Sequence, residues 1–368
     1  MFSTLDRYIL RSLLVNYLIS LAIMLSLYVA LDMFVNMDEF TEHGYRMSTV
    51  LLNIADYYWP NLLLFFAQLS GVITLFACLS VIARMRKLNE MTAMLASGVS
   101  LFRLARPVLL FGLAMTGLLV IDTELLIPTI AHRLAREHDD VDGKRAYEVL
   151  FLHDRDNNLL SAGQFLPTTS DLRRVLILTR DDTGQITRTI EADQAVWEPP
   201  TSERPVGRWR LERGRMIARV VNPQGGFGPR EDKQITYPAY YESDLSPEAI
   251  QLRQAEGWVR FLSLARLREL AQAEAQDRDA ILRTRHARVA APIVSIVLLL
   301  LGLPFFLDRS PASVLSDAGK CLVVCGLCYV STFVSQSIRT EAQSALIAWL
   351  PIFIFGTLSM VLLDRVKT

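Results

Sequence analysis

The 368-residue sequence has none of the short motifs that mark a nucleotide-binding or hydrolytic site. It lacks a G-x-x-x-x-G-K-[ST] loop, which excludes ATP hydrolysis by that kind of site. It also lacks G-x-S-x-G, H-E-x-x-H and paired C-x-x-C elements with zinc spacing. We therefore expect a chain that is not an enzyme and that holds no cofactor or metal of its own. Any ATP that its work requires must be used by a separate subunit.

Cysteine is scarce, and the few cysteines all lie in apolar runs. Cys321, Cys325 and Cys328 recur at a spacing that places them on one helix face, and Cys78 lies in an earlier run. Because thiols in such runs are buried, we interpret them as small packing residues rather than as metal or redox groups. The long polar segment in the middle of the chain has no cysteine, so no disulfide crosslinks it.

Neither sign of charge is in excess, since 38 basic residues balance 38 acidic ones, but hydrophobic residues make up 51% of the chain. That apolar excess is typical of a membrane protein. A run of about 20 predominantly apolar residues is long enough to cross the hydrocarbon core of a bilayer. Runs of this kind predict transmembrane helices near Leu13–Val35, Pro60–Ala83, Ala105–Pro128, Val289–Leu307, Cys321–Ile338 and Ala345–Leu363.

Charges in the short loops predict the orientation, because cytoplasmic loops are enriched in Lys and Arg. The loop between the first two predicted helices is acidic, which places it outside. Basic residues at both termini (Arg7, Arg11, Arg365 and Lys367) agree with cytoplasmic ends. The loop between the second and third helices is basic and is expected in the cytoplasm; it contains Arg84, Arg86, Lys87, Arg103 and Arg106 against Glu90.

The segment from about Thr129 to Arg288 then lies on the outer face, which is the periplasm in a double-membraned bacterium. Alternating apolar and polar residues, separated by turn residues, predict short antiparallel strands in a sandwich or jelly roll. From about Ser246 the pattern becomes helical, with Ser and Pro suited to a helix start. The strands are expected at Ala146–Leu152, Arg174–Arg180, Gln185–Ala192, Gly207–Arg213 and Arg215–Val221.

The predicted fold class is a polytopic α-helical membrane protein with six transmembrane helices, arranged three and three around an inserted periplasmic all-β, jellyroll-like domain. The expected parts are transmembrane helices one to three (1–128, with a cytoplasmic helix at about 88–100), the β domain (129–245), a helical connector (246–288) and transmembrane helices four to six (289–368).

One polar stretch, Asn89–Ser100, interrupts the apolar runs. Met91, Met94 and Leu95 share one face of a short helix, while Ser97 and Gly98 follow it. One interpretation is a helix that docks in a groove of an ATPase, with the methionines in the groove, Glu90 offered to an arginine and Gly98 allowing a sharp turn. The other is a helix that rests on the inner leaflet between basic residues. The periodicity alone does not favour either.

Two basic clusters flank the insert and are candidates for binding phosphate groups of a lipid. Arginine is the side chain best suited to such groups because it binds them with two parallel hydrogen bonds. The alternative is that these residues anchor helix ends at the membrane interface. We also expect Asp32, Asp122 and Glu124, late in their helices, to lie near water at the outer interface. The basic residues are Arg133, Arg136, Arg283, Arg285 and Arg288.

The chain resembles the lipopolysaccharide export permeases of the LptF/LptG type over essentially its whole length. The resemblance begins with "LDRYILRSLL", continues through "EMTAMLASGVS" and "LIP", and ends in "RHARVAAPIVSIVLLLLGLPF". The Glu…Ala-Ser-Gly-x-Ser element is the most specific of these motifs. A second match is the arrangement of three helices, a β insert and three helices. The sequence of the first helix resembles LptG more than LptF.

The resemblance implies a permease subunit of an ABC-type exporter that extracts lipopolysaccharide from the outer leaflet of the bacterial inner membrane. It implies a second LptF/LptG-like subunit, a cytoplasmic LptB-like ATPase dimer that uses the ATP, and a periplasmic bridge of LptC/LptA-like proteins with similar β domains. No nucleic acid is expected. It also favours docking for the Asn89–Ser100 helix, through the matching positions Glu90, Met94, Ala96, Ser97, Gly98 and Ser100.

One departure concerns the segment just after the first helix, where some family members have lysines that the resemblance assigns to the lipid phosphates. This chain has Asp38 and Glu39 there and no lysine, which argues against a phosphate contact at this point unless a divalent cation bridges it. Any basic contact must come from elsewhere in this subunit or from the second subunit. The alternative function, from a different class, is a membrane subunit of an ATPase complex that transmits force or serves as a scaffold and moves no lipid itself.

Overall fold

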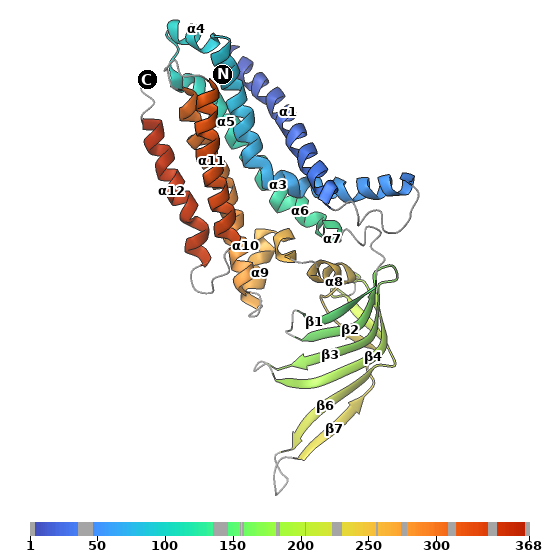
Figure 1. The fold of residues 1–368 in the computed structure, drawn as a ribbon. Helices are drawn as coiled ribbons and strands as arrows, with labels where there is room; N and C mark the ends of the chain where they lie inside the picture. The colour runs from blue at the N-terminus through green and yellow to red at the C-terminus, as the bar shows by residue number, and fades with distance from the viewer. Residues whose placement is uncertain are drawn as a thin grey trace.

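The computed structural model describes residues 4–35, 47–134, 146–154, 156, 158–181, 185–202, 204–222, 230–254, 257–273, 278–307, 314–337 and 344–364. A bundle of long helices forms one part and a curved β-sheet forms the other, with short helices between them (Figure 1). The predicted Arg136 lies outside the described residues, as do the side chain of Arg133 and the acidic pair Asp38 and Glu39.

Six helices are long and apolar enough to cross a membrane, as predicted. The third membrane helix begins as α5, passes through a π-helical turn, η1 (Asp122–Leu126), and ends as α6 (Ile127–Thr129). A short helix, α7 (Ala131–Leu134), follows it. The fourth begins at Arg278, inside the range expected for the connector, because the polar start of this helix gives no apolar signal. The main helices are α1 (Thr4–Val35), α3 (Met47–Lys87), α5 (Leu101–Ile121), α10 (Arg278–Leu307), α11 (Val314–Ser337) and α12 (Ser344–Asp364).

Helix α10 lies at the centre of the bundle, where it contacts α3, α5, α11 and α12. Small residues allow the close approach, as is common between membrane helices. A Cβ at Gly71 of α3 would lie 2.9 Å from Ser295 Oγ, and one at Gly302 would lie 2.6 Å from Leu75 Cδ1. All four cysteines are buried, free of disulfides and part of this core, which agrees with their interpretation as packing residues.

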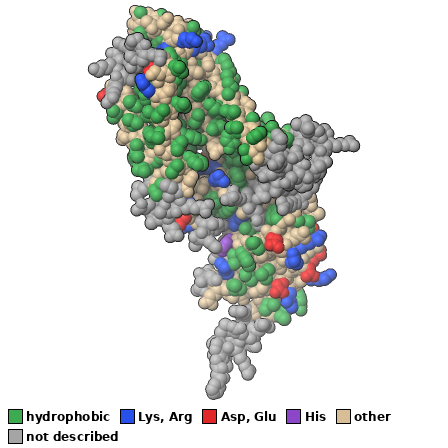
Figure 2. Space-filling view, in the orientation of Figure 1, with side chains coloured by type: hydrophobic (Ala, Val, Ile, Leu, Met, Phe, Trp, Pro, Cys, Tyr) green, Lys and Arg blue, Asp and Glu red, His purple; other side chains and the backbone are tan. Residues whose placement is uncertain are grey.

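Hydrophobic side chains cover much of the outer face of the bundle, whereas acidic and basic side chains lie on the β part and at the ends of the bundle (Figure 2). On α1 the outward face includes Leu18, Ile23 and Leu27, which are 54–58% exposed. Such a surface is stable when it faces lipid or another membrane helix.

The β domain is an antiparallel sheet in the order β1-β2-β3-β4-β5-β8, with β6 paired to β4 and β7 paired to β6. Its core contains Phe165, Ile177 and Trp209. The expected strands are present, but β2, β7 and β8 were not predicted, because "LLSAGQFL" and "REDKQIT" do not alternate cleanly and β8 is very short. The strands are β1 (Tyr147–His153), β2 (Leu159–Leu166), β3 (Asp171–Arg180), β4 (Ile186–Glu198), β5 (Arg208–Glu212), β6 (Arg215–Asn222), β7 (Arg230–Thr236) and β8 (Tyr240–Glu242).

The connector consists of α8 (Pro247–Gln254), a 3₁₀ turn η3 (Trp258–Phe261) and α9 (Leu264–Ala273), between the bundle and the sheet (Figure 1). Ser246 Oγ accepts a hydrogen bond from the Ala249 N–H at 3.2 Å, so it caps α8 as the sequence predicts.

Candidate functional sites at the two ends of the helical bundle

The first candidate site is the turn between α3 and α5. It contains a single short helix, α4 (Glu90–Ala96), which is shorter than the predicted range of about 88–100. Asn89 and Gly98, on either side of it, have φ angles of 56° and 86°, so both ends bend sharply. Ser100 then accepts a hydrogen bond from the Arg103 N–H at 3.4 Å and caps α5.

The apolar face of α4 packs against the chain's own helices. Met91 is only 4% exposed and belongs to the bundle core, while Met94 and Leu95 are half-buried against the same core. Met91 is therefore packed inside this chain in the structure, and its docking in a groove of a partner stays a prediction. Amphipathic spacing indicates that one helix face is buried, but it does not say against what.

The opposite face of α4 is open to the surroundings. Thr92, Ala93, Ala96 and Ser97 are exposed, and Leu88, just before the helix, is 56% exposed. Lys and Arg side chains gather at this end of the bundle (Figure 2). The surface available to another protein therefore consists of small and polar residues, with one leucine at its edge.

Glu90 joins α4 to the first helix. The Tyr8 hydroxyl donates a hydrogen bond of 3.0 Å to Glu90 Oε2. A movement of α4 therefore displaces α1 through this hydrogen bond. It also displaces α3 and α5, because the chain connects α4 directly to both. Sequence reasoning selected Glu90 but not its partner, because 82 positions separate them.

A buried ion pair lies at the same end. Arg86 Nη1, near the end of α3, is 2.9 Å from Asp317 Oδ2 in the first turn of α11, and the two side chains are 11% and 8% exposed. Arg86 Nη1 also lies 3.5 Å from the carbonyl oxygen of Phe305 on α10. Lys320 Nζ is 3.7 Å from Asp317 Oδ1. This cluster fixes three membrane helices beside α4, and no local pattern in the sequence predicts it.

The second candidate site lies at the other end of the bundle, where α10 begins. Arg288 Nη1 is 3.3 Å from Glu124 Oε1, and the arginine side chain is 10% exposed. Arg288 also donates to the carbonyl oxygens of Thr123 and Arg260. Both of its terminal nitrogens thus donate hydrogen bonds inside the chain. In the structure Arg288 joins parts of this chain, and its binding of lipid phosphate stays a prediction.

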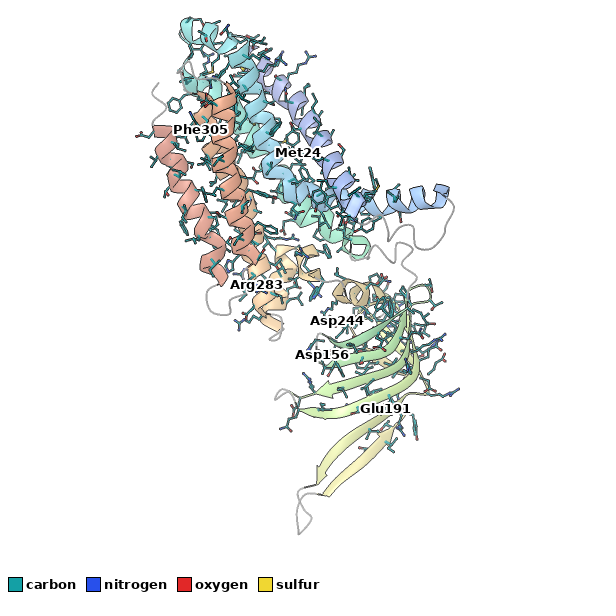
Figure 3. The ribbon with its side chains drawn as sticks, in the orientation of Figure 1. Met24, Asp156, Glu191, Asp244, Arg283 and Phe305 are labelled. Atoms are coloured by element: carbon teal, nitrogen blue, oxygen red, sulfur yellow. The ribbon has the colours of Figure 1, made fainter. Side chains whose placement is uncertain are left out.

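Arg283 and Arg285 are half-buried near the start of α10, which contacts α9. Figure 3 shows the position of Arg283 near this start. Among the residues that the structure describes, neither has an ion-pair partner within 4.0 Å. These two arginines therefore stay candidates for binding an anionic group.

The carboxylates of the membrane helices are less exposed than predicted. Asp122 is 1% exposed, and neither of its oxygens has a hydrogen-bond partner among the described residues. Asp32 accepts a hydrogen bond from the Tyr58 hydroxyl at 2.8 Å. Asp122, the first residue of η1, is therefore buried within the chain rather than in contact with water.

Within the described residues, no group of three or more His, Cys, Asp or Glu side chains is arranged to hold a metal ion.

The family model described as "Lipopolysaccharide export system permease LptF/LptG" matches residues 7–365, which is nearly the whole chain. No curated protein matches the chain.

Proposed function

This chain belongs to the LptF/LptG family of lipopolysaccharide export permeases, and from this premise we propose that it is the membrane subunit of an ABC-type exporter. Family membership and six apolar helices make it a multi-pass protein of the inner membrane. The subunit extracts lipopolysaccharide from the outer leaflet and passes it to a periplasmic bridge, while a separate LptB-like ATPase dimer hydrolyses the ATP.

The proposed orientation places the α4 end of the bundle in the cytoplasm and the β domain in the periplasm. The exposed bases of the α4 end, among them Arg7, Arg11, Arg84 and Lys87, support this orientation. The β domain then stands on the side where the lipid must leave.

The observation that carries the proposal is the way α4 is held. Its inner face is anchored in the bundle core by Met91 and its first residue is bound to α1 by Tyr8. Its outer face is exposed. An ATPase that binds the outer face would therefore move α1, α3 and α5 together, without unfolding the turn. We propose that nucleotide binding moves α4 and thereby narrows a lipid cavity formed with a second LptF/LptG-like subunit.

The lipid side of the proposal is supported by chemistry at the outer end. Arg283 and Arg285 are available for phosphates, and arginine suits that group. The exposed apolar faces of α1 and α11, where Leu27 and Phe333 are 54% and 61% exposed, suit acyl chains or the second subunit.

A bulky residue on the exposed face of α4 tests docking. Glu90→Arg would also break the bond to Tyr8, so Ala93→Trp is the cleaner change. We expect Ala93→Trp to reduce co-purification of the ATPase and lipid-stimulated hydrolysis by about tenfold, because overpacking a close contact costs about 1–3 kcal/mol. The matched control is Ala114→Trp on the exposed face of α5. If both variants retain the ATPase equally, α4 is not the docking site.

A second measurement separates lipid export from force transmission without lipid. The complex is purified in mild detergent and its bound lipids are identified by mass spectrometry. Lipopolysaccharide should be present, and Arg283→Gln with Arg285→Gln should reduce it. A complex that hydrolyses ATP but never retains this lipid would support the alternative function.

A further inference from the structure

Glu124 in η1 uses both of its carboxylate oxygens to join separate elements. Oε1 lies 3.3 Å from Arg288 Nη1 on α10, and Oε2 accepts a hydrogen bond of 2.8 Å from the N–H of Leu264, the first residue of α9. A carboxylate at a helix N-terminus is favourable because it faces unpaired N–H groups. One side chain thus connects the third membrane helix, the fourth and the connector.

Arg288 strengthens the same junction from the other side. Besides Glu124, it contacts the carbonyl oxygen of Thr123 in η1 and that of Arg260 in η3. The π-helical turn explains why the Thr123 carbonyl is available, since such a turn disrupts the regular α-helical hydrogen bonds and is frequent at functional sites. With the arginine side chain 10% exposed and the glutamate 23% exposed, water screens this ion pair weakly.

The connector is attached to the β domain at its other end. Arg253 of α8 donates a hydrogen bond to the carbonyl oxygen of His153, the last residue of β1. The Arg253 guanidinium carbon also lies 5.3 Å from the centre of the Trp258 ring in η3. Arg253 therefore links β1 to η3, the turn in which the Arg260 carbonyl accepts a hydrogen bond from Arg288.

The end of β1 is itself held firmly. Asp154 accepts hydrogen bonds from the Tyr241 hydroxyl, from the Asn158 amide and from two backbone N–H groups. Burial raises the pKa of Tyr241, and the hydrogen bond and charge of Asp154 raise it further. Tyr241 therefore remains a donor throughout the physiological pH range. Asp156 and Asp244 mark this end of the sheet, which faces α8 (Figure 3).

Apolar packing supports the polar contacts along the same path. Phe261 of η3 and Leu252 of α8 pack with Ile127 and Ala131 at the end of the third membrane helix. The connector is thus fixed to the membrane helices on one side and to β1 on the other, and a shift of either part displaces it.

We propose that Glu124 and Arg288 are positioning residues that couple the relative position of the third and fourth membrane helices to the orientation of the β domain. The proposal rests on the function proposed above. When the cavity narrows, α5 and α10 move, and the junction carries that movement through η3 and α8 to β1. The β domain is then set to receive the lipid at the moment of its release.

The test compares Glu124→Gln, Arg288→Gln and the double variant with Glu269→Gln, a matched control. Glu269 is on the same connector helix, α9, and pairs with Arg266 at 2.9 Å, but its side chain is 66% exposed. Spin labels at Leu113→Cys on α5 and Ile186→Cys on β4, which are 58% and 43% exposed, report the distance between bundle and sheet. The full chain is studied in its complex with the ATPase.

We expect Glu124→Gln and Arg288→Gln to broaden the distribution of label distances. Lipid transferred per ATP hydrolysed should fall by about tenfold, equivalent to about 1.4 kcal/mol of coupling, while hydrolysis itself changes by less than about twofold. The double variant should lose less than the sum of the two single losses, because the Glu124–Arg288 ion pair is shared while each side chain also has a contact of its own. Glu269→Gln should match wild type. Arg253→Gln, at the other end of the path, should broaden the distribution in the same way.

Three results would overturn the proposal: an unchanged distance distribution in Glu124→Gln, an equal change in Glu269→Gln, or losses in the double variant that add. Variants that do not fold are identified because their buried cysteines react with a thiol dye. If Arg288→Gln does not fold, Arg288→Lys, which keeps the charge, is measured in its place. If wild type moves no lipid, the proposed function fails, but the distances still decide whether the junction couples the two parts.

Discussion

The buried ion pair between Arg86 and Asp317 makes a quantitative prediction about stability. Its partners come from α3 and α11, lie 2.9 Å apart and are 11% and 8% exposed. Removing one partner of a buried pair leaves the other charge poorly compensated, which costs about 3–5 kcal/mol. Because Lys320 remains 3.7 Å from Asp317, the aspartate is the partner whose removal should cost more.

We expect Asp317→Asn to lower the free energy of unfolding by about 3 kcal/mol and Arg86→Gln by about 2 kcal/mol. Since the two substitutions remove one shared interaction, the double variant should cost about 3 kcal/mol rather than about 5. The coupling energy is then about 2 kcal/mol, or more than tenfold in the unfolding equilibrium constant.

Unfolding in mixed micelles with increasing SDS provides the measurement, with fluorescence of the five tryptophans as the signal. The control is Asp193→Asn, which disrupts a pair of 3.0 Å between side chains that are 67% and 87% exposed. An exposed pair contributes at most about 1 kcal/mol. The reasoning is refuted if Asp193→Asn costs as much as Asp317→Asn, or if the costs of the two buried substitutions simply add.

Three further predictions concern other parts of the chain. Gly98→Ala should lower the free energy of unfolding by about 1 kcal/mol, because its φ of 86° disfavours any side chain even though nothing lies within 4 Å of the added Cβ. A thermal melt measures this, with Val99→Ala at the next position as the control. Asp122→Asn should leave thermal stability unchanged or raise it, because both carboxylate oxygens are buried without a hydrogen-bond partner among the described residues. A clear loss would contradict this and show that the attraction to the Arg288 charge outweighs the cost of burial. Tyr241→Phe should destabilise the β domain by about 1–3 kcal/mol, as it removes a donor from buried Asp154, and amide exchange at β1 would detect this; unchanged exchange would contradict it.

Most of the architecture could be predicted from the sequence because the bilayer imposes a strong pattern. Long apolar runs gave the six helices, and alternation gave strands such as β3 and β6. The strand β7 was missed because an edge strand is paired on one side only and can be polar along its length. The first residues of α10 were predicted as helical but were assigned to the connector, since Arg278–Arg288 lies beyond the apolar run.

The candidate sites were only partly predictable. Glu90 and the turn around it were selected by a motif and by amphipathic spacing, but the burial of Met91 depends on which surface lies opposite it. Arg288 was selected as a free base because its charge can be read from the sequence. Its pairing with the Glu124 carboxylate and with the Arg260 carbonyl cannot be read there. Contacts across 164 positions depend on how the helices pack, which no local pattern encodes.

Strand β4 belongs to two separate ladders, and this divides the sheet. Residues Gln194–Glu198 pair with β5, while only Arg188–Glu191 pair with β6. The β6–β7 hairpin projects beyond the rest of the sheet (Figure 1) and is attached through that short ladder. Cooperative units open with free energies that reflect their own contacts. We therefore expect the hairpin to open as a separate unit, with its amide hydrogens exchanging while β1–β4 stay protected, so that one end of the sheet melts and reforms without loss of the fold.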